Sequence, residues 1–286
     1  MLMNMLNLQS KPWLKRAATG WLLGMLMACT GWAETLTEKS WRILNDGATD
    51  TSLEKRTQAI SALGLIQKDA HAEELASKAL TDNKADVRAA AATALGGMNA
   101  TQAIPELRMA LKDADAGVVL AAAHSLLLMK DWTAYEVYYA VLTGKRKSGA
   151  SLLDQQKKML QDKQKMAQFA AETGIGFIPF GGLGMTVYKT LTKDDVSPVR
   201  AAAAKLLTND PDPKSADALV EAASDKSWIV RAAAVEAIGR RGNQALAEKI
   251  APNLDDEKSV VQYTAAAAII RLNELPPPKP RPQSKR

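Results

Sequence analysis

Charged side chains that could do chemistry recur along this chain at one spacing, an aspartate followed six residues later by an arginine. The spacing is found at Asp50 and Arg56, Asp82 and Arg88, Asp194 and Arg200, and Asp225 and Arg231. Carboxylate and guanidinium groups can form ion pairs, cap helices or transfer protons. An alanine-rich run that favours a helix follows each pair, so we interpret the pairs as structural contacts at turns and not as catalytic acids.

Other groups that could support catalysis or bind a metal are sparse. His71 and His124 are 53 residues apart, and neither has a cysteine or a second histidine nearby. A zinc site needs three or four converging ligands. The glycine-rich stretch at 174–184 lacks the closing Gly-Lys-Ser/Thr of a phosphate-binding loop. We therefore expect no metal, no cofactor, no small-molecule substrate and no enzymatic activity.

The first 33 residues have the composition of a targeting segment. Three basic residues, the last of them Arg16, precede an apolar stretch at 17–28 that is too short to span a bilayer comfortably. Small residues at positions 31 and 33 then suit cleavage before Glu34. Residues 1–33 therefore predict a secretory signal peptide and an exported protein.

Cys29 leaves other readings of this segment open. It is the only cysteine of the chain, and residues 26–29 (Leu-Met-Ala-Cys) are similar to a bacterial lipobox. In a lipobox the cysteine is lipidated and becomes the new N-terminus. An uncleaved anchor is the third alternative. The first two readings predict a periplasmic or a lipid-anchored protein of the cell envelope.

The aspartates mark an internal repeat of 31 or 32 residues. Six of them begin equivalent segments, and only the step from Asp113 to Asp194 is longer. A further helix precedes each aspartate, so each unit reads as helix, turn, helix. These first helices are predicted at 36–44, 72–80, 101–111, 133–142, 214–223 and 244–254. We expect an all-α superhelix, a solenoid of about six helix pairs with one helical insert and almost no strand.

Glycines stand near the ends of several alanine-rich helices. Gly64, Gly96 and Gly239 occupy positions where a helix commonly ends in a left-handed residue. We expect these three glycines to be the C-terminal caps of their helices.

Three segments carry a family resemblance. DVRAAAATALG (86–96), SPVRAAAAKLL (197–207) and WIVRAAAVEAIG (228–239) resemble HEAT repeats, in particular the HEAT-like repeats of phycobilisome lyases. The resemblance implies a ladder in which aspartate and arginine link successive repeats. Val119 and Gln262 replace the arginine in the third and sixth units, so the ladder should be incomplete there. A changed last unit is also typical of a terminal cap.

The long step in the repeat contains an insert at 144–192. Residues 151–172 predict one basic helix with an apolar stripe. Three readings stay open, because the insert could cover the solenoid's own apolar surface, bind a partner segment or lie on an anionic membrane surface. The predicted partner-binding residues lie in the insert and just before it: Trp132, Tyr135, Tyr138, Lys157, Lys158, Phe177 and Phe180.

The net charge of +6 comes from the two ends of the chain. The segment 1–33 holds three basic residues and the tail 276–286 holds four, and neither holds an acidic one. The rest has 30 basic and 31 acidic residues, so it lacks the broad basic face that nucleic-acid binding requires. The tail itself (PPPKPRPQSKR) is expected to be extended and disordered.

These observations favour a non-catalytic scaffold or adaptor in the bacterial cell envelope. It would bind protein partners through the concave face of repeats at 34–143 and 193–275 and through the insert. One alternative is a ligand-binding or lyase-like role, which the family resemblance implies. The other is membrane-surface association through residues 144–185.

Overall fold

The computed structural model describes residues 34–142 and 196–275. The chain divides into a short unit, Met1–Thr35, and a unit from Leu36 onward that holds every helix described here. Helices joined by short turns make up the described residues, and no strand occurs among them. The all-α prediction is therefore confirmed. None of these helices is both long enough and apolar enough to cross a membrane.

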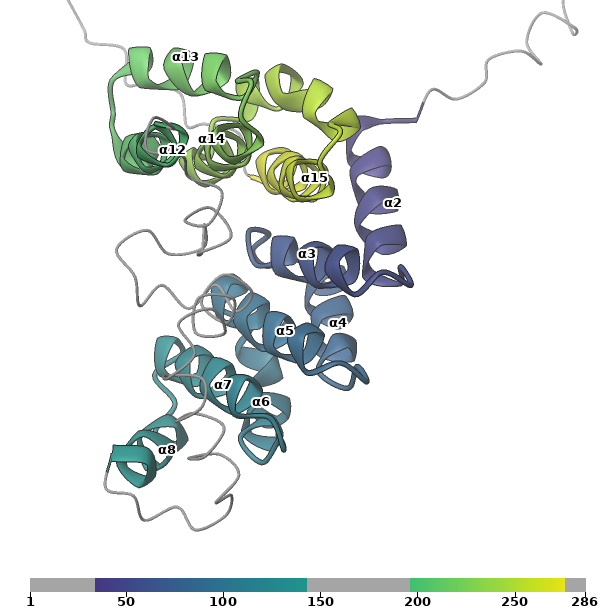
Figure 1. The fold of residues 1–286 in the computed structure, drawn as a ribbon, viewed down its shortest axis with the longest axis vertical. Helices are drawn as coiled ribbons and strands as arrows, with labels where there is room; N and C mark the ends of the chain where they lie inside the picture. The colour runs from purple at the N-terminus through teal and green to yellow at the C-terminus, as the bar shows by residue number, and fades with distance from the viewer. Residues whose placement is uncertain (1–33, 143–195, 276–286) are drawn as a thin grey trace, which may run out of the picture. The chain divides into compact units, whose positions relative to one another are not determined.

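The N-terminal series of helices precedes the insert and alternates first and second helices of each unit (Figure 1). It comprises α2 (Leu36–Ala48), α3 (Leu53–Leu63), α4 (Ala70–Ala79), α5 (Ala85–Met98), the short 3₁₀ helix η1 (Thr101–Ala103), α6 (Ile104–Ala110), α7 (Ala116–Leu128) and α8 (Thr133–Leu142).

The C-terminal series follows the insert and ends before the tail. It comprises α12 (Ser197–Leu206), η2 (Leu207–Asn209), α13 (Pro213–Ala222), α14 (Trp228–Arg241), η3 (Gln244–Leu246), η4 (Glu248–Asp255) and α15 (Ser259–Glu274). The second helix of each unit is the alanine-rich one, and its small side chains are almost all buried, as at Ala91, Ala234 and Ala267. Alanine at these positions lets neighbouring helices approach closely.

The helix predicted at 244–254 is present, but it is 3₁₀ and not α-helical. These residues form η3 and η4, and Pro252 lies inside η4. Proline has no N–H to donate and its ring clashes with the carbonyl four residues earlier, so a regular α-helix cannot continue through it. The tighter 3₁₀ winding avoids that conflict.

Of the three predicted glycine caps, those at Gly96 and Gly239 are wrong. The left-handed residues that end α5 and α14 are Asn99, with φ 56°, and Gly242, with φ 72°. Gly64 is the C-cap residue of α3 as predicted, but it has an ordinary right-handed φ of −60°. Gly96 and Gly239 lie inside their helices, where the next helix crosses closely. A Cβ on Gly239 would lie 2.8 Å from the Cβ of Ala268, and one on Gly96 would overlap Ser125.

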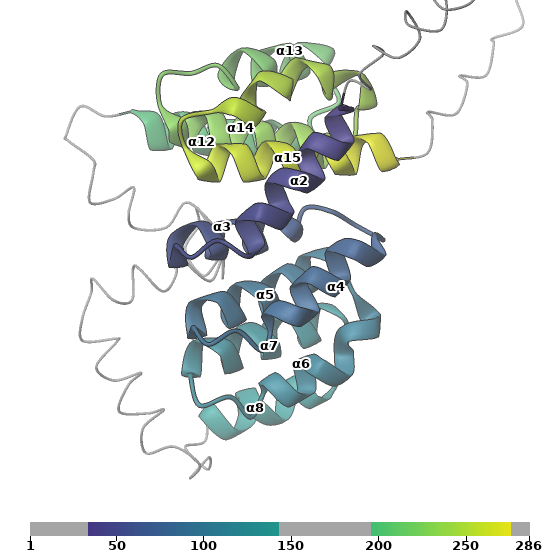
Figure 2. The ribbon, with the colours of Figure 1, turned by 90° about the vertical axis from the view of Figure 1, so that its right-hand side faces the viewer.

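The second helices stack side by side in an order that differs from their order in the chain. α12 packs on α14 and α14 on α15, whereas α3 packs on α5 and α5 on α7. α15 also packs on α2 and α3, so the C-terminal series comes before the N-terminal series in the stack (Figures 1 and 2). The sixth unit is therefore not a terminal cap, because α15 lies between α14 and the α2–α3 pair.

We call the contact of α15 with α2 and α3 the junction. Its apolar part includes Tyr263 of α15, which is buried against Gly47 of α2. A Cβ on Gly47 would lie only 2.5 Å from the Tyr263 ring. Residues 265–270 of α15 are fully buried. The junction is thus packed as closely as a contact between consecutive units.

Polar contacts across the junction join residues more than 200 positions apart. Ser259 Oγ donates to Gln58 Oε1 at 2.7 Å, and Asn273 Nδ2 donates to Thr37 Oγ1 at 2.9 Å. Beside the junction, Lys39 Nζ of α2 lies 2.7 Å from Oδ2 of Asp255, the last residue of η4. The hydrogen bond of Asn273 with Thr37 brings the start of α2 next to the end of α15.

Candidate functional site

Arginine–aspartate pairs link neighbouring units of the stack. The complete rungs are Arg56 with Asp82 (Nε to Oδ2 2.9 Å), Arg88 with Asp113 (2.7 Å), Arg231 with Asp256 (2.6 Å) and Arg200 with Asp225. In the first three, the arginine Nη1 also donates to the backbone carbonyl of the aspartate in its own unit. Each such guanidinium therefore holds two successive turns in register.

The aspartate of a rung also shapes its own turn. Asp113 accepts a hydrogen bond from the N–H of Asp115 at 2.8 Å, and it also accepts one from the Arg88 guanidinium. Burial raises the pKa of Asp113, but the hydrogen bonds from Arg88 and from the Asp115 N–H outweigh burial and set the pKa below 3.8. Asp82 and Asp256 have lowered pKa values for the same reasons. These carboxylates are ionised at neutral pH, which suits structural ties.

The ladder is broken at two places. Val119 is buried in α7 and cannot form a rung, and the separate pair of Arg108 of α6 with Asp131 (Nη2 to Oδ2 2.6 Å) lies at the turn between α7 and α8. At the junction, Gln262 stands where the arginine that faces Asp50 would be. Asp50 pairs with Lys55 of its own unit instead (Nζ to Oδ2 3.5 Å), and like the aspartates of the rungs it accepts the N–H two residues on, that of Ser52, at 2.7 Å.

The predicted site residues are described only in part. Asp194 and Cys29 lie outside the described residues, as do Lys157, Lys158, Phe177 and Phe180 of the insert. Of the predicted partner-binding set, the structure places Trp132, Tyr135 and Tyr138 at α8. α8 packs on α7 and is the last described helix before the insert.

We use the term aromatic face for Trp132, which directly precedes α8, together with Tyr135 and Tyr139 of α8, because the three follow helical spacing. Trp132 is 79% exposed and Tyr135 39% exposed, and their ring centroids lie 5.4 Å apart at an angle of 32°. Tyr139, which is not among the predicted partner-binding residues, is 64% exposed. Tyr138 differs from the other two predicted aromatic residues, because it is half-buried against the core and burial raises its pKa.

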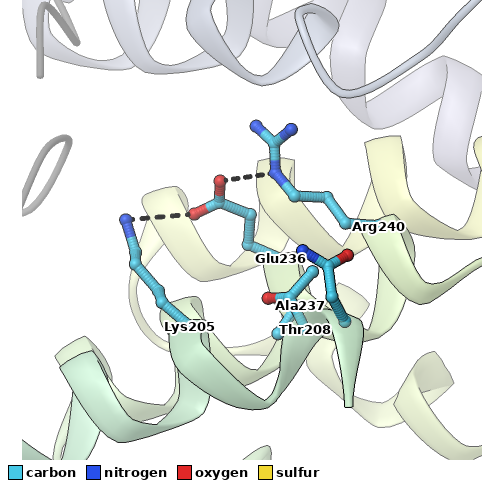
Figure 3. Close-up of a pocket in the computed structure, with 6 residues that line it drawn as sticks. Lys205, Thr208, Glu236, Ala237 and Arg240 are labelled. Atoms are coloured by element: carbon cyan, nitrogen blue, oxygen red, sulfur yellow. Dashed lines mark hydrogen bonds and ion pairs between the residues drawn. The ribbon is translucent and has the colours of Figure 1, made fainter. Parts of the chain in front are cut away.

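A shallow polar pocket lies between α12, η2 and α14. Figure 3 shows Lys205 and Arg240 on either side of Glu236. The Lys205 Nζ lies 3.5 Å from one carboxylate oxygen and the Arg240 Nε lies 3.0 Å from the other. All three side chains are partly exposed, so such pairs contribute little to stability. Both cations of the pocket, Lys205 and Arg240, are thus already paired with the carboxylate of Glu236.

His71 makes contacts that are typical of a structural role. His71 Nε2 lies 3.0 Å from Asn45 Oδ1, and its ring packs edge-on against Trp41 with centroids 4.6 Å apart. No three histidine, cysteine, aspartate or glutamate side chains within 34–142 and 196–275 are grouped as metal ligands.

Arg271 of α15 is an important residue that the sequence analysis missed. Its Nε donates to the carbonyl of Gly239 at 3.0 Å and its Nη1 to the carbonyl of Leu65 at 2.9 Å. It thus satisfies carbonyl groups at the C-terminal ends of α14 and α3, which have no partner inside their own helices. The only sequence signal was a cation in the last turn of a helix, a position that favours positive charge.

Comparison with known proteins agrees with this architecture. A family model of HEAT repeats matches residues 42–127, 72–147 and 186–270, which confirms the resemblance drawn from the sequence. No curated protein matches the chain.

Three solved structures illustrate the similarity in fold. The CpcE–CpcF complex of phycocyanin lyase from Nostoc sp. PCC7120 is 21% identical, with a TM-score of 0.32 over 84% of this chain and 96% of that one. Human deoxyhypusine hydroxylase in complex with glycerol is 17% identical, with a TM-score of 0.30 over 83% and 97%. A designed armadillo repeat protein is 16% identical, with a TM-score of 0.24 over 84% and 100%.

Proposed function

This chain belongs to the HEAT repeat family, and from that premise we propose that it is a non-catalytic scaffold or adaptor that binds a protein partner in the bacterial cell envelope. HEAT and armadillo repeats generally mediate protein–protein interaction, because stacked helices form extended binding surfaces. The close-packed alanine core and the arginine–aspartate rungs support a fixed surface of this kind.

The aromatic face is the observation that carries the proposal. Most large apolar side chains of the described helices are buried, yet Trp132, Tyr135 and Tyr139 are exposed together at α8. Tryptophan and tyrosine supply much of the binding energy in protein interfaces, because they bury a large area at a small cost in conformational entropy. We infer that a partner protein buries these rings.

The envelope location is part of the proposal and rests on residues 1–33. The n-region, the apolar stretch and the small residues before Glu34 support export, and Cys29 supports lipid anchoring. N-terminal sequencing of the mature protein separates the two routes. A mature chain that starts at Glu34 indicates cleavage, whereas a blocked chain that incorporates labelled palmitate, and loses the label in Cys29→Ala, indicates lipidation.

Site-specific cross-linking in cells tests the scaffold role. A photoreactive residue at position 132 should trap a discrete envelope protein, and Tyr135→Ala should reduce the yield at least several-fold. A photoreactive residue at Leu206, which is even more exposed, is the matched control and should not trap that protein. The proposal fails if position 132 traps nothing in the cell envelope while the purified protein turns over a substrate.

A further inference from the structure

We propose that the aromatic face of α8 binds the proline-rich tail, residues 276–286, of a second copy of this chain. The inference rests on the proposed function, since it names a protein partner for the same face. Extended proline-rich segments dock on exposed aromatic rings, because the polyproline II conformation is already ordered before binding and presents pyrrolidine rings along its edges.

The spacing of the aromatic face fits such a segment. Tyr139 follows Trp132, the residue directly before α8, by seven positions, which corresponds to about 10 Å along the helix axis at 1.5 Å per residue. Pro277 and Pro280 are three residues apart, which places them on one edge of a polyproline II helix about 9 Å apart. Each proline can therefore meet one end of the face, and Tyr135 lies between them.

Charge complementarity supports the same occupant. Glu136 is exposed in the middle of the aromatic face, and it forms no ion pair with any described residue. The neighbouring Asp131 is already paired with Arg108. The tail has four basic residues and no acidic one, and Lys279 and Arg281 flank Pro280. A tail bound through Pro277 and Pro280 brings cations to Glu136 and to the faces of the tyrosine rings.

The stack indicates that the tail comes from a second copy. From α15 the helices pack in the order α3, α5, α7, so α7 is three helix-to-helix steps away, or roughly 25–30 Å at 8–10 Å each. Pro280 is five residues beyond Leu275, which allows a reach of only about 16 Å in an extended conformation. The tail and the aromatic face are different surfaces, so the contact is head-to-tail and not an isologous dimer.

Peptide binding to the full chain tests the inference. A fluorescent peptide of residues 275–286 should bind saturably, and its affinity should fall at least tenfold for the Trp132→Ala chain. A peptide with Pro277 and Pro280 changed to alanine should bind as weakly as this variant. The Leu206→Ala chain, which removes an exposed apolar side chain elsewhere, should bind like the wild type. Absence of binding, or binding that is unchanged by Trp132→Ala, overturns the inference.

The oligomeric state and the cross-linked species identify the occupant. In sedimentation velocity the full chain should associate with rising concentration, and deletion of 276–286 or Trp132→Ala should abolish the association. A photoreactive residue at position 132 should cross-link to the tail of a second copy. Cross-links to residues 143–195 overturn the inference, and cross-links only to another envelope protein overturn it while leaving the proposed scaffold role intact.

Discussion

The α5–α7 contact and the junction solve the same packing problem with different polar groups. Between α5 and α7, Arg88 binds both oxygens of Asp113 at 2.7 and 2.8 Å, and Ser125 Oγ donates to the carbonyl of Ala92 at 2.7 Å. At the junction Gln262 replaces the arginine, and the Lys39–Asp255 pair beside it uses a carboxylate that is 71% exposed. Both interfaces bury alanine-rich helices. Close packing therefore sets the architecture, and the rungs add register where units are consecutive in the chain.

The difference also bears on folding. Consecutive units meet after about 30 residues of chain, whereas the junction joins residues more than 200 positions apart. Closing a longer loop costs more conformational entropy, although the cost grows only logarithmically with length. We therefore expect the junction to form after the helices within each series have packed together, and to open before them on unfolding.

Removal of a rung should have the largest effect. Arg88→Ala leaves Asp113 partly buried without its cation, and it should lower the free energy of unfolding by about 2–3 kcal/mol, less than for a fully buried pair. Urea titration with circular dichroism measures the change. Arg240→Ala is the matched control, because its partner Glu236 is partly exposed and not buried, and it should cost less than about 1 kcal/mol. Equal losses of stability in the two variants would contradict the structural role of the buried rungs.

Overfilling the junction should come next. In Gly47→Ala the new Cβ lies 2.5 Å from the Tyr263 ring and 2.7 Å from the Cβ of Ala59, so we expect stability to fall by about 1–3 kcal/mol. Hydrogen exchange should show faster opening of α15 and α2 but not of α7. Gly64→Ala is the control, since its Cβ would meet Ala94 at 3.1 Å and needs a smaller shift. A uniform change in exchange along the stack would argue against a separate junction.

Installing the missing rung should stabilise the junction. Gln262→Arg places a cation opposite Asp50, and it should raise the free energy of unfolding only slightly, because solvent screens the pair. The Ser52 N–H holds the pKa of Asp50 below 3.8, so the added stability should be present above pH 3.8 and disappear as the pH falls through this lowered pKa. Thermal unfolding measures it. Added stability that survives Asp50→Asn would show that no rung has formed.

The smallest expected effect is a pH dependence near neutrality at the end of α15. Burial, and then the nearby Asp69, raises the pKa of Glu274 from 4.5 to about 7. The folded chain holds a proton that the unfolded chain releases, so stability should fall as the pH rises from 4.5 to 7. Glu274→Gln should remove that slope. The change should be below about 1 kcal/mol because the side chain is partly exposed, and an unaltered pH profile would contradict it.

Local patterns predicted the elements better than their arrangement. The spacing of aspartate, arginine and alanine correctly predicted that the chain is built of helix pairs. The helix expected at 133–142 has the same start and end as α8. The predicted caps at Gly96 and Gly239 were wrong because these two glycines allow a close helix approach, which depends on the neighbouring unit. Tyr138 and Tyr139 are adjacent in sequence, so composition alone could not tell which ring turns inward. The hydrogen bonds of Arg271 to the carbonyls of Gly239 and Leu65 depend on tertiary packing.

The hydrogen bond of Asn273 with Thr37 has a topological consequence. A short peptide link from residue 275 to residue 36 would join segments that already touch, and new termini could then open at 142 and 196. The resulting circular permutant, 196–275 followed by 36–142, would read the helices in the order α12, α14, α15, α3, α5, α7 and α8. The order of these helices along the chain would then match their order in the stack. In this sense the natural chain is a circularly permuted form of a simple linear repeat array.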